Sequence, residues 1–357
     1  MPKGAFRNVA ITGVSTAVPS YSKCLDEEVD LFGSQKNIDK LKRITGLHSR
    51  RIANEQTTSL DLCVYSAERL LEAMKLDRSG IDGVVFVTQT PDHRIPNNAS
   101  LVHGMLGLER DCLCFDINHG CSGYIYGLIN SFSLIESGMC RRILLLVGDT
   151  LSKVINPRDK SLSIIHGDAG TATIVEYTEQ ENESSFILYS DGSKAKAICV
   201  EAGAYRKMSC PETAIEQEDS EGNHRSPEQL YMNGLEVFNF ALQHVPPLVN
   251  EAMTLSRKTM DDIDLFVFHQ ANGIINRGII DKLSIPLEKA PTDVIRDYGN
   301  SSCATIPHVL SSALGNSPGP HELSLMLTGF GVGLSLAACV TKLNDAVILP
   351  VLEYDRI

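Results

Sequence analysis

One cysteine in a glycine-rich turn is the residue of this chain best placed to act as a nucleophile. Cys121 lies within residues 116–124, which follow the short apolar run 112–115 and precede the apolar residues 125–128. This order predicts a strand, a tight turn and then a helix, with the thiol on the first helical residues. The unpaired N–H groups and partial positive charge of a helix N-terminus favour thiolate, and such settings lower a cysteine pKa from about 8.5 to roughly 3.5–7.5. Cys121 is therefore the candidate nucleophile.

The elements that would position this cysteine recur later in the chain. Residues 81–90 and 262–271 are similar short apolar runs, and each follows an amphipathic helical pattern, over 60–76 and 237–255 respectively. Continuous apolar runs of this length are expected of strands that are buried on both faces of a sheet. The chain is thus predicted to alternate strands and helices in two similar units.

Landmark residues after the two runs keep nearly the same spacing. Cys121 lies almost as far beyond Thr88 as Asn300 lies beyond His269, and an apolar run that ends in glycine follows each of them. Three matches in register indicate a tandem duplication of an α/β unit. Equivalent turns of duplicated units lie on the same side of a molecule. Cys121, His269 and Asn300, each expected at a strand-to-helix turn, are therefore predicted to converge.

Each of these residues also has a plainer interpretation. A cysteine is more often a small core residue than a nucleophile. His269 could simply end a buried strand, and Asn300, which follows a glycine, could be a turn residue that tolerates left-handed geometry. The turn context of Cys121 and the shared register of the three residues favour a joint chemical role.

Composition restricts the class of protein. The 357 residues carry a formal net charge of −12 and a hydrophobic fraction of 43%, which does not favour nucleic acid as a partner. No apolar stretch approaches the ~20 residues of a membrane span, and the N-terminus lacks an apolar signal core. The ten cysteines form no CxxC pair, so no metal site is expected, and reduced thiols favour a cytoplasmic location.

The domain organisation follows from the repeat. Residues 1–180 are expected to form an N-terminal half that carries Cys121, and residues 181–357 a C-terminal half that carries His269 and Asn300. Residues 181–225 form a polar segment between the halves, with an exposed acidic loop.

Near the N-terminus, a basic cluster could be a patch for an acidic partner or an ordinary solvated helix face. Its members are Lys36, Lys40, Lys42, Arg43, Arg50 and Arg51.

Several motifs, spread over nearly the whole chain, resemble one enzyme family. They are the turn around Cys121, HQAN at 269–272, YGNSS at 298–302, GFGVG at 329–333, and the segments 156–159, 166–170 and 232–238. This ordered set resembles 3-oxoacyl-acyl-carrier-protein synthase III, which belongs to the thiolase-fold superfamily. The resemblance implies a thiolase-like α/β fold in which two pseudo-equivalent α/β halves form a five-layered αβαβα sandwich.

The resemblance also implies a two-step chemistry. Cys121 would take an acyl group from acyl-CoA, and the backbone N–H groups of Cys121 and Val332 would form the oxyanion hole. Side-chain N–H groups of His269 and Asn300 would stabilise the enolate that forms when a malonyl thioester of acyl carrier protein loses CO2. The enolate would then attack the acyl group on Cys121. No cofactor is implied to be permanently bound, because the coenzyme A thioester is a substrate.

The chain departs from the family pattern where coenzyme A would bind. Family members stack a tryptophan on the adenine, whereas this chain has no tryptophan and Lys40 stands at that place. Ile274 replaces an arginine that often follows the HQAN motif, with Arg277 one turn later. Lys40, Lys160 and Arg277 are therefore the expected contacts with coenzyme A or acyl carrier protein.

The acyl pocket is implied to differ as well. Its lining is expected to include Leu151, Phe330 and Ile95, where Ile95 comes from the partner subunit of a homodimer and replaces a residue that is commonly aromatic. At the oxyanion hole, Val332 replaces a usual glycine. Ile95 favours a donor other than acetyl, and the larger side chain of Val332 is expected to crowd the acyl group.

The sequence thus predicts a condensing enzyme that joins an acyl group to a malonyl unit with loss of CO2. Two alternatives remain. The first is an acyltransferase that passes the acyl group from Cys121 to an alcohol or amine without decarboxylation. The second is a catalytically silent partner subunit. Asn300 favours condensation over simple transfer, since simple transfer has no enolate to stabilise. The intact Cys121, His269 and Asn300 argue against a silent subunit.

Overall fold

A mixed sheet forms the first half of the protein. The computed structural model describes residues 1–317 and 321–355. Strands of this sheet follow the order β6-β5-β7-β8-β2. β5, β6 and β7 are parallel, whereas β8 runs antiparallel to both β7 and β2. The bounds are β2 Val9–Pro19, β5 Gly83–Val87, β6 Leu113–Ile117, β7 Arg142–Asp149 and β8 Ala169–Tyr177.

The second half repeats this arrangement with one strand fewer in the parallel part. Its order is β14-β15-β16-β9-β1, with β14 parallel to β15 and with β16 antiparallel to both β15 and β9. β14, β15, β16 and β9 therefore correspond to β5, β7, β8 and β2. The bounds are β1 Lys3–Phe6, β9 Ser184–Ser190, β14 Leu265–Phe268, β15 His321–Gly331 and β16 Ser335–Ile348.

The two halves interlock. The C-terminal part of β16 pairs in parallel with β2, as does β17 (Leu352–Tyr354), and β1 from the chain start pairs with β9. The boundary that we propose between the halves, at 180/181, falls in the connection from β8 to β9. Strands therefore pair across this boundary in both directions.

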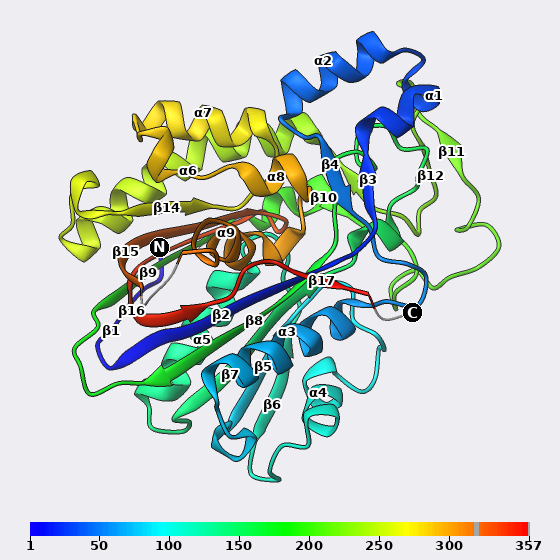
Figure 1. Ribbon diagram of the computed structural model, residues 1–357. Helices are drawn as coiled ribbons and strands as arrows, with labels where there is room; N and C mark the ends of the chain where they lie inside the picture. The colour runs from blue at the N-terminus through cyan, green and yellow to red at the C-terminus, as the bar shows by residue number, and fades with distance from the viewer. Residues whose placement is uncertain (318–320, 356–357) are drawn as a thin grey trace.

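Helices form three layers around the two sheets (Figure 1). α3 and α4 cover the outer face of the first sheet, α5 and α9 lie between the sheets, and α6 with α7 cover the outer face of the second. Helix, sheet, helix, sheet and helix make five layers. The bounds are α3 Ser59–Met74, α4 Asn98–Leu106, α5 Gly123–Glu136, α6 Gly234–Ser256, α7 Gly273–Leu283 and α9 Thr305–Leu314.

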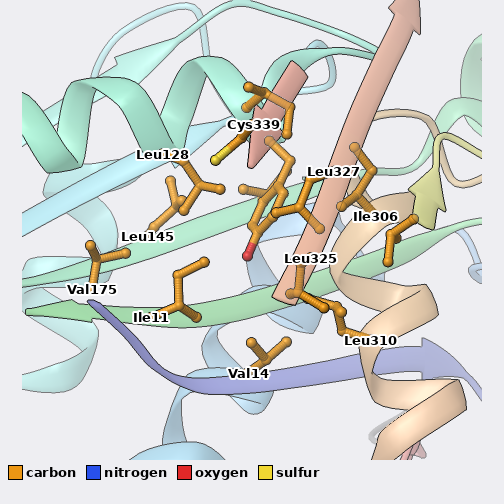
Figure 2. Close-up of a cluster of buried hydrophobic side chains, with 14 of the residues drawn as sticks. Ile11, Val14, Leu128, Leu145, Val175, Ile306, Leu310, Leu325, Leu327 and Cys339 are labelled. Carbon is orange, nitrogen blue, oxygen red and sulfur yellow. The ribbon is translucent and has the colours of Figure 1, made fainter. Parts of the chain in front are cut away.

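The middle layer is the main core. Figure 2 shows Leu128 of α5 with Ile306 and Leu310 of α9 packed between Leu145 of β7 and Leu325 of β15. All five side chains are fully buried. Burial of one such side chain contributes about 1.5–3 kcal/mol relative to exposure, so the core fixes the two middle helices, whose N-terminal ends lie beside the candidate active site.

The remaining helices and strands lie in the connections between the elements of the five layers. α1 (Val29–Phe32), α2 (Gln35–Thr45) and the pair β3 (Ser22–Cys24) and β4 (Ser49–Arg51) precede α3. After β9 come two small antiparallel pairs, β10 (Ile198–Cys199) with β13 (Tyr231–Met232) and β11 (Gln217–Glu218) with β12 (His224–Arg225). α8 is Asp293–Asp297, and the 3₁₀ helices are Leu25–Glu28, Arg78–Gly80, Leu151–Val154, Gly192–Ala197, Met260–Asp262, Leu287–Lys289 and Ser302–Ala304.

Most of the predicted elements are present. The run at 81–90 contains β5, the run at 262–271 contains β14, and the helical patterns over 60–76 and 237–255 contain most of α3 and α6. The prediction that Asn300 lies at a strand-to-helix turn is wrong. It follows α8 and precedes α9, because the residues before it form a helix instead of a strand equivalent to β6.

Candidate active site

Cys121, His269 and Asn300 line one cavity of about 150 Å³. Cys121 comes from the β6–α5 connection, His269 from the end of β14, and Asn300 from the α8–α9 connection. The first half therefore supplies the sulfur, and the second half supplies the imidazole and the carboxamide. The structure brings together the three side chains that the repeat predicted to converge, although their catalytic roles remain predictions.

Cys121 lies just before helix α5 instead of within its first turn. Ser122 is the N-cap and Gly123 the first helical residue. Burial raises the pKa of the Cys121 thiol, and the N–H of Val332 opposes that rise, while the negative charge of Asp149 adds to it. The expected lowering of this pKa is therefore wrong. Desolvation of the thiolate outweighs the helix terminus because the sulfur is enclosed.

Asp149 is a buried carboxyl group that sequence reasoning missed. It ends β7, and its Oδ1 accepts hydrogen bonds from the backbone N–H of Gln89 at 2.7 Å and from the hydroxyl of Thr88 at 3.0 Å. Burial also raises the pKa of Asp149. A signal for it lies in the repeat, since Thr88, the counterpart of His269, is the residue whose hydroxyl donates to Asp149.

Two backbone N–H groups oppose the rise in the pKa of the Cys121 thiol. They belong to Val332 and to Cys121 itself. These are the two donors that the family resemblance assigns to the oxyanion hole. Gly331 allows the backbone before Val332 to lie close to the side chain of Cys121. A Cβ at position 331 would lie 2.5 Å from Sγ and 2.6 Å from Cβ of Cys121. The φ of Gly331, +152°, is also one that L side chains rarely adopt.

We expect Gly331→Ala to abolish acylation of Cys121. The added methyl group would collide with the sulfur, and the backbone strain would cost about 1–3 kcal/mol of stability. Gly104→Ala is the matched control, since a Cβ at this position of α4 meets no atom within 4 Å. Intact-protein mass after exposure to acyl-CoA, together with the melting temperature, checks both variants. Normal acylation of the folded Gly331→Ala protein would contradict this geometry.

His269 is held as a neutral imidazole. Its Nδ1 lies 2.6 Å from the hydroxyl oxygen of Thr305, and its ring meets that of Phe330 edge to face at 5.3 Å. Burial, with a smaller effect from neighbouring His166, lowers the pKa of His269 to about 3. The ring is therefore uncharged at neutral pH and can act only through a lone pair or a neutral N–H.

The carboxamide of Asn300 has a fixed orientation. Its Oδ1 accepts the backbone N–H of Ser302 at 2.9 Å, and its Nδ2 donates to the carbonyl of Ala271 at 3.3 Å. The amide group has two N–H bonds, so one of them is left for a ligand in the cavity. Ser302 has a left-handed φ of 55°. A left-handed φ in a buried residue that is not glycine costs conformational energy, and such strain is found at functional sites.

His166 is a second histidine of the cavity, and no role was predicted for it. Its Nδ1 lies 3.1 Å from the carbonyl oxygen of Leu162, and burial lowers its pKa. Its neighbours pair with Asn300: the N–H of Asn300 donates to the carbonyl of Ile165, and the N–H of Gly167 donates to the carbonyl of Asn300. In the sequence, only the family resemblance of the segment 166–170 points to this histidine.

The predicted acyl-pocket residues divide into two groups. Leu151 and Phe330 line the cavity, together with the apolar side chains of Ile198, Leu230 and others from both halves. Ile95 does not line the cavity of its own chain and is 83% exposed. Its assignment to the acyl pocket of a partner subunit stays a prediction.

Of the predicted coenzyme A and carrier contacts, Arg277 lines an outer groove, which also contains Arg43. Ile274 lines both this groove and the inner cavity. Lys40 is exposed on α2, and Lys160 is half-buried in a turn after η3, the 3₁₀ helix Leu151–Val154. The groove and the cavity are therefore adjacent, but the three residues do not form one cluster in a single pocket.

The basic cluster is also less uniform than its sequence indicates. Lys42 pairs with Asp26, Arg50 with Glu28 and Arg51 with Glu353, each at 2.7 Å. In the described part of the chain, the exposed members without an ion pair are Lys36, Lys40 and Arg43.

Among residues 1–317 and 321–355, no group of three or more His, Cys, Asp or Glu could hold a metal ion, and no helix has the length and apolarity of a membrane span.

Comparisons with known proteins agree with the resemblance. The family model of 3-oxoacyl-[acyl-carrier-protein (ACP)] synthase III matches residues 115–207, and the model of its C-terminal part matches residues 253–343. A putative 3-oxoacyl-[acyl-carrier-protein] synthase 3 of Campylobacter jejuni is 34% identical, with 99% of each chain covered. A beta-ketoacyl-[acyl-carrier-protein] synthase III of Natranaerobius thermophilus is 33% identical, with 84% of this chain and 88% of the relative covered.

Solved structures show the same similarity in three dimensions. The crystal structure of a 3-oxoacyl-(acyl-carrier protein) synthase from Burkholderia xenovorans superposes with a TM-score of 0.92 at 35% identity and covers 99% of each chain. A beta-ketoacyl-[acyl carrier protein] synthase III from Thermus thermophilus has a TM-score of 0.80 at 31% identity, over 94% of this chain and 100% of the other. The predicted thiolase-like fold is therefore confirmed, and the chain belongs to the 3-oxoacyl-[acyl-carrier-protein] synthase III family of condensing enzymes.

Proposed function

We propose that this chain loads an acyl group from acyl-CoA onto Cys121 and condenses it with malonyl-acyl-carrier protein, with loss of CO2, to give a 3-oxoacyl thioester. The observation that carries the proposal is the single cavity shared by Cys121, His269 and Asn300. Family membership supports a condensing enzyme, and the side chains support each step. A coenzyme A thioester is a substrate in this scheme, and no permanently bound cofactor is needed.

Loading uses the sulfur and the two backbone N–H groups beside it. The sulfur of Cys121 attacks the thioester carbonyl, and the oxygen of the tetrahedral intermediate takes the place next to the N–H groups of Cys121 and Val332. One such donor is typically worth about 2.7–4 kcal/mol of transition-state stabilisation. Both groups lower the pKa of the Cys121 thiol, which supports this assignment.

Condensation uses the second half of the protein. The thioester oxygen of the malonyl group becomes an enolate oxygen when CO2 leaves, and the free N–H of Asn300 is oriented for it. His269 would supply a second N–H donor. The enolate carbon then attacks the acyl carbonyl and releases the thiolate of Cys121, which takes a proton from water. An acyltransferase acting on an alcohol or amine would have no use for the fixed carboxamide.

Measurement of product and CO2 tests this function. A panel of coenzyme A thioesters of different chain length is offered with malonyl-acyl-carrier protein, and the 3-oxoacyl product and the CO2 are quantified. We expect equal amounts of both with at least one donor. Transfer to an added alcohol or amine without CO2 would support the acyltransferase instead. The absence of any reaction or adduct would support a silent partner subunit.

The outer groove is the proposed approach for the substrate carriers. Arg43 and Arg277 line it, and Lys40 lies one helical turn before Arg43 on α2. An acidic carrier protein would be attracted by these charges. We further propose a homodimer in which Ile95 of one subunit contributes to the acyl pocket of the other.

We expect Lys40→Glu to raise the KM for malonyl-acyl-carrier protein about 2- to 5-fold at low salt, with little effect at high salt, because exposed charges mainly affect association. Arg110→Glu changes the charge equally at an exposed residue beyond α4 and is the control. Steady-state kinetics at two ionic strengths check both variants. Unchanged kinetics in Lys40→Glu would assign this residue to an ordinary solvated helix face.

A further inference from the structure

The imidazole of His269 is held by a hydroxyl group. Its Nδ1 lies 2.6 Å from Oγ1 of Thr305, a fully buried residue at the start of α9. The same Oγ1 lies 3.0 Å from the carbonyl oxygen of Ser302, to which it donates. A hydroxyl can donate and accept, whereas a backbone carbonyl only accepts. The direction of the Thr305 hydrogen is therefore coupled to which ring nitrogen of the neutral imidazole carries the proton.

Two arrangements satisfy this group of residues. When Thr305 donates to Ser302, its oxygen accepts Nδ1–H of His269, and Nε2 presents a lone pair. When the hydroxyl turns to Nδ1 and donates to it, Nε2 carries the N–H. The carbonyl of Ser302 keeps a partner in both arrangements, because the backbone N–H of Thr305 also donates to it. Neither tautomer of the ring thus leaves this buried carbonyl unpaired.

The two half-reactions need opposite tautomers. In loading, the S–H bond of Cys121 breaks, a bond forms between its sulfur and the acyl carbon, and coenzyme A leaves. The proton must pass from one sulfur to the other, and Nε2 with a lone pair can carry it. In condensation, the bond to the carboxylate breaks, CO2 leaves, and the electron pair becomes the enolate, whose oxygen needs an N–H donor. The released thiolate then takes a proton from water.

We propose that Thr305 is a positioning residue that lets His269 act as a proton acceptor during loading and as an N–H donor during condensation. This inference rests on the proposed function of the same site. The ring changes its tautomer between the half-reactions, after coenzyme A has left, by exchange of a ring proton with water. The hydroxyl turns with it and keeps the imidazole in place.

Nitrogen NMR of the histidine-labelled enzyme tests the tautomers directly. We expect His269 to carry its proton on Nδ1 in the free enzyme, since that arrangement keeps both hydrogen bonds of the Thr305 hydroxyl. With a malonyl-coenzyme A analogue that has an amide in place of the thioester, and so resists decarboxylation, we expect the proton on Nε2. His269→Gln identifies the signals. The same tautomer in both samples, at saturation with the analogue, would overturn the inference.

Substitutions of Thr305 test its role in the reaction. Thr305→Val keeps the shape but removes the hydroxyl, and we expect both half-reactions to slow on the order of 100-fold. Thr305→Ser should retain both rates. Thr328→Val is the matched control, because Thr328 is also fully buried but its hydroxyl has no partner among the described residues. Melting temperatures show whether each variant is folded.

The outcomes separate this inference from the proposed function. If the unsubstituted enzyme neither loads Cys121 nor releases CO2, the proposed function fails. If that enzyme is active and folded Thr305→Val performs both half-reactions at the same rates, the inference about Thr305 fails alone. A loss in Thr305→Val with recovery in Thr305→Ser, and with the expected change of tautomer in the unsubstituted enzyme, supports it.

Discussion

Cys121→Ala should give a folded protein that takes up no acyl group from any coenzyme A thioester. The substitution removes the only thiol among the described side chains that line the cavity and leaves the backbone N–H groups in place. Condensation should fall by at least about 10⁴-fold, the scale seen when a covalent nucleophile is removed. Intact-protein mass spectrometry after mixing with acyl-CoA measures the loading step directly.

Cys303→Ala is the matched control for that experiment. Cys303 is also buried and close to the site, but its thiol lies 3.2 Å from the carboxyl group of Asp149 and does not line the cavity. We expect this variant to be loaded normally on Cys121. An acyl adduct that persists in Cys121→Ala would assign the nucleophile to another residue.

Asn300→Ala should separate the two half-reactions. Loading needs the sulfur and its backbone donors, so acylation of Cys121 should change little. Condensation should fall about 10²- to 10³-fold, because one donor to the enolate oxygen is lost. Single-turnover measurements of acyl-enzyme formation and of CO2 release give the two rates separately.

The folded state of Asn300→Ala needs its own control. The substitution leaves the backbone N–H of Ser302 without the acceptor that it has in the structure, which costs about 1–3 kcal/mol of stability. The kinetics should therefore be measured well below the melting temperature of the variant. An equal loss in loading and in condensation would show that Asn300 supports the whole site and has no special role with the enolate.

The repeat made much of the fold predictable. Buried strands such as β5 and β14 have continuous apolar sequences of similar length, and the landmarks after them are in register. The matched spacing in the two repeats was sufficient to predict that Cys121, His269 and Asn300 lie together, and they line one cavity. Family resemblance was needed for the five layers and for the reaction, because apolar patterns do not specify how two sheets stack.

Other features depended on contacts that sequence patterns do not reveal. Asn300 lies between two helices because its half has no counterpart of β6, and the spacing of the landmarks hides that difference. The pKa of Cys121 is raised because enclosure of the sulfur outweighs the nearby helix terminus, and enclosure is a tertiary property. Thr305 and Asp149 reach the site through side-chain contacts with residues far away in the sequence.

The mass of the protein through one turnover is the most direct test of the central claim that Cys121 carries the acyl group between two reactions. After mixing with an accepted acyl-CoA, we predict a mass increase equal to one acyl group, located on the peptide that contains Cys121. Addition of malonyl-acyl-carrier protein should remove this mass and release an equal amount of CO2. A product formed without any acyl mass on Cys121 would contradict the account.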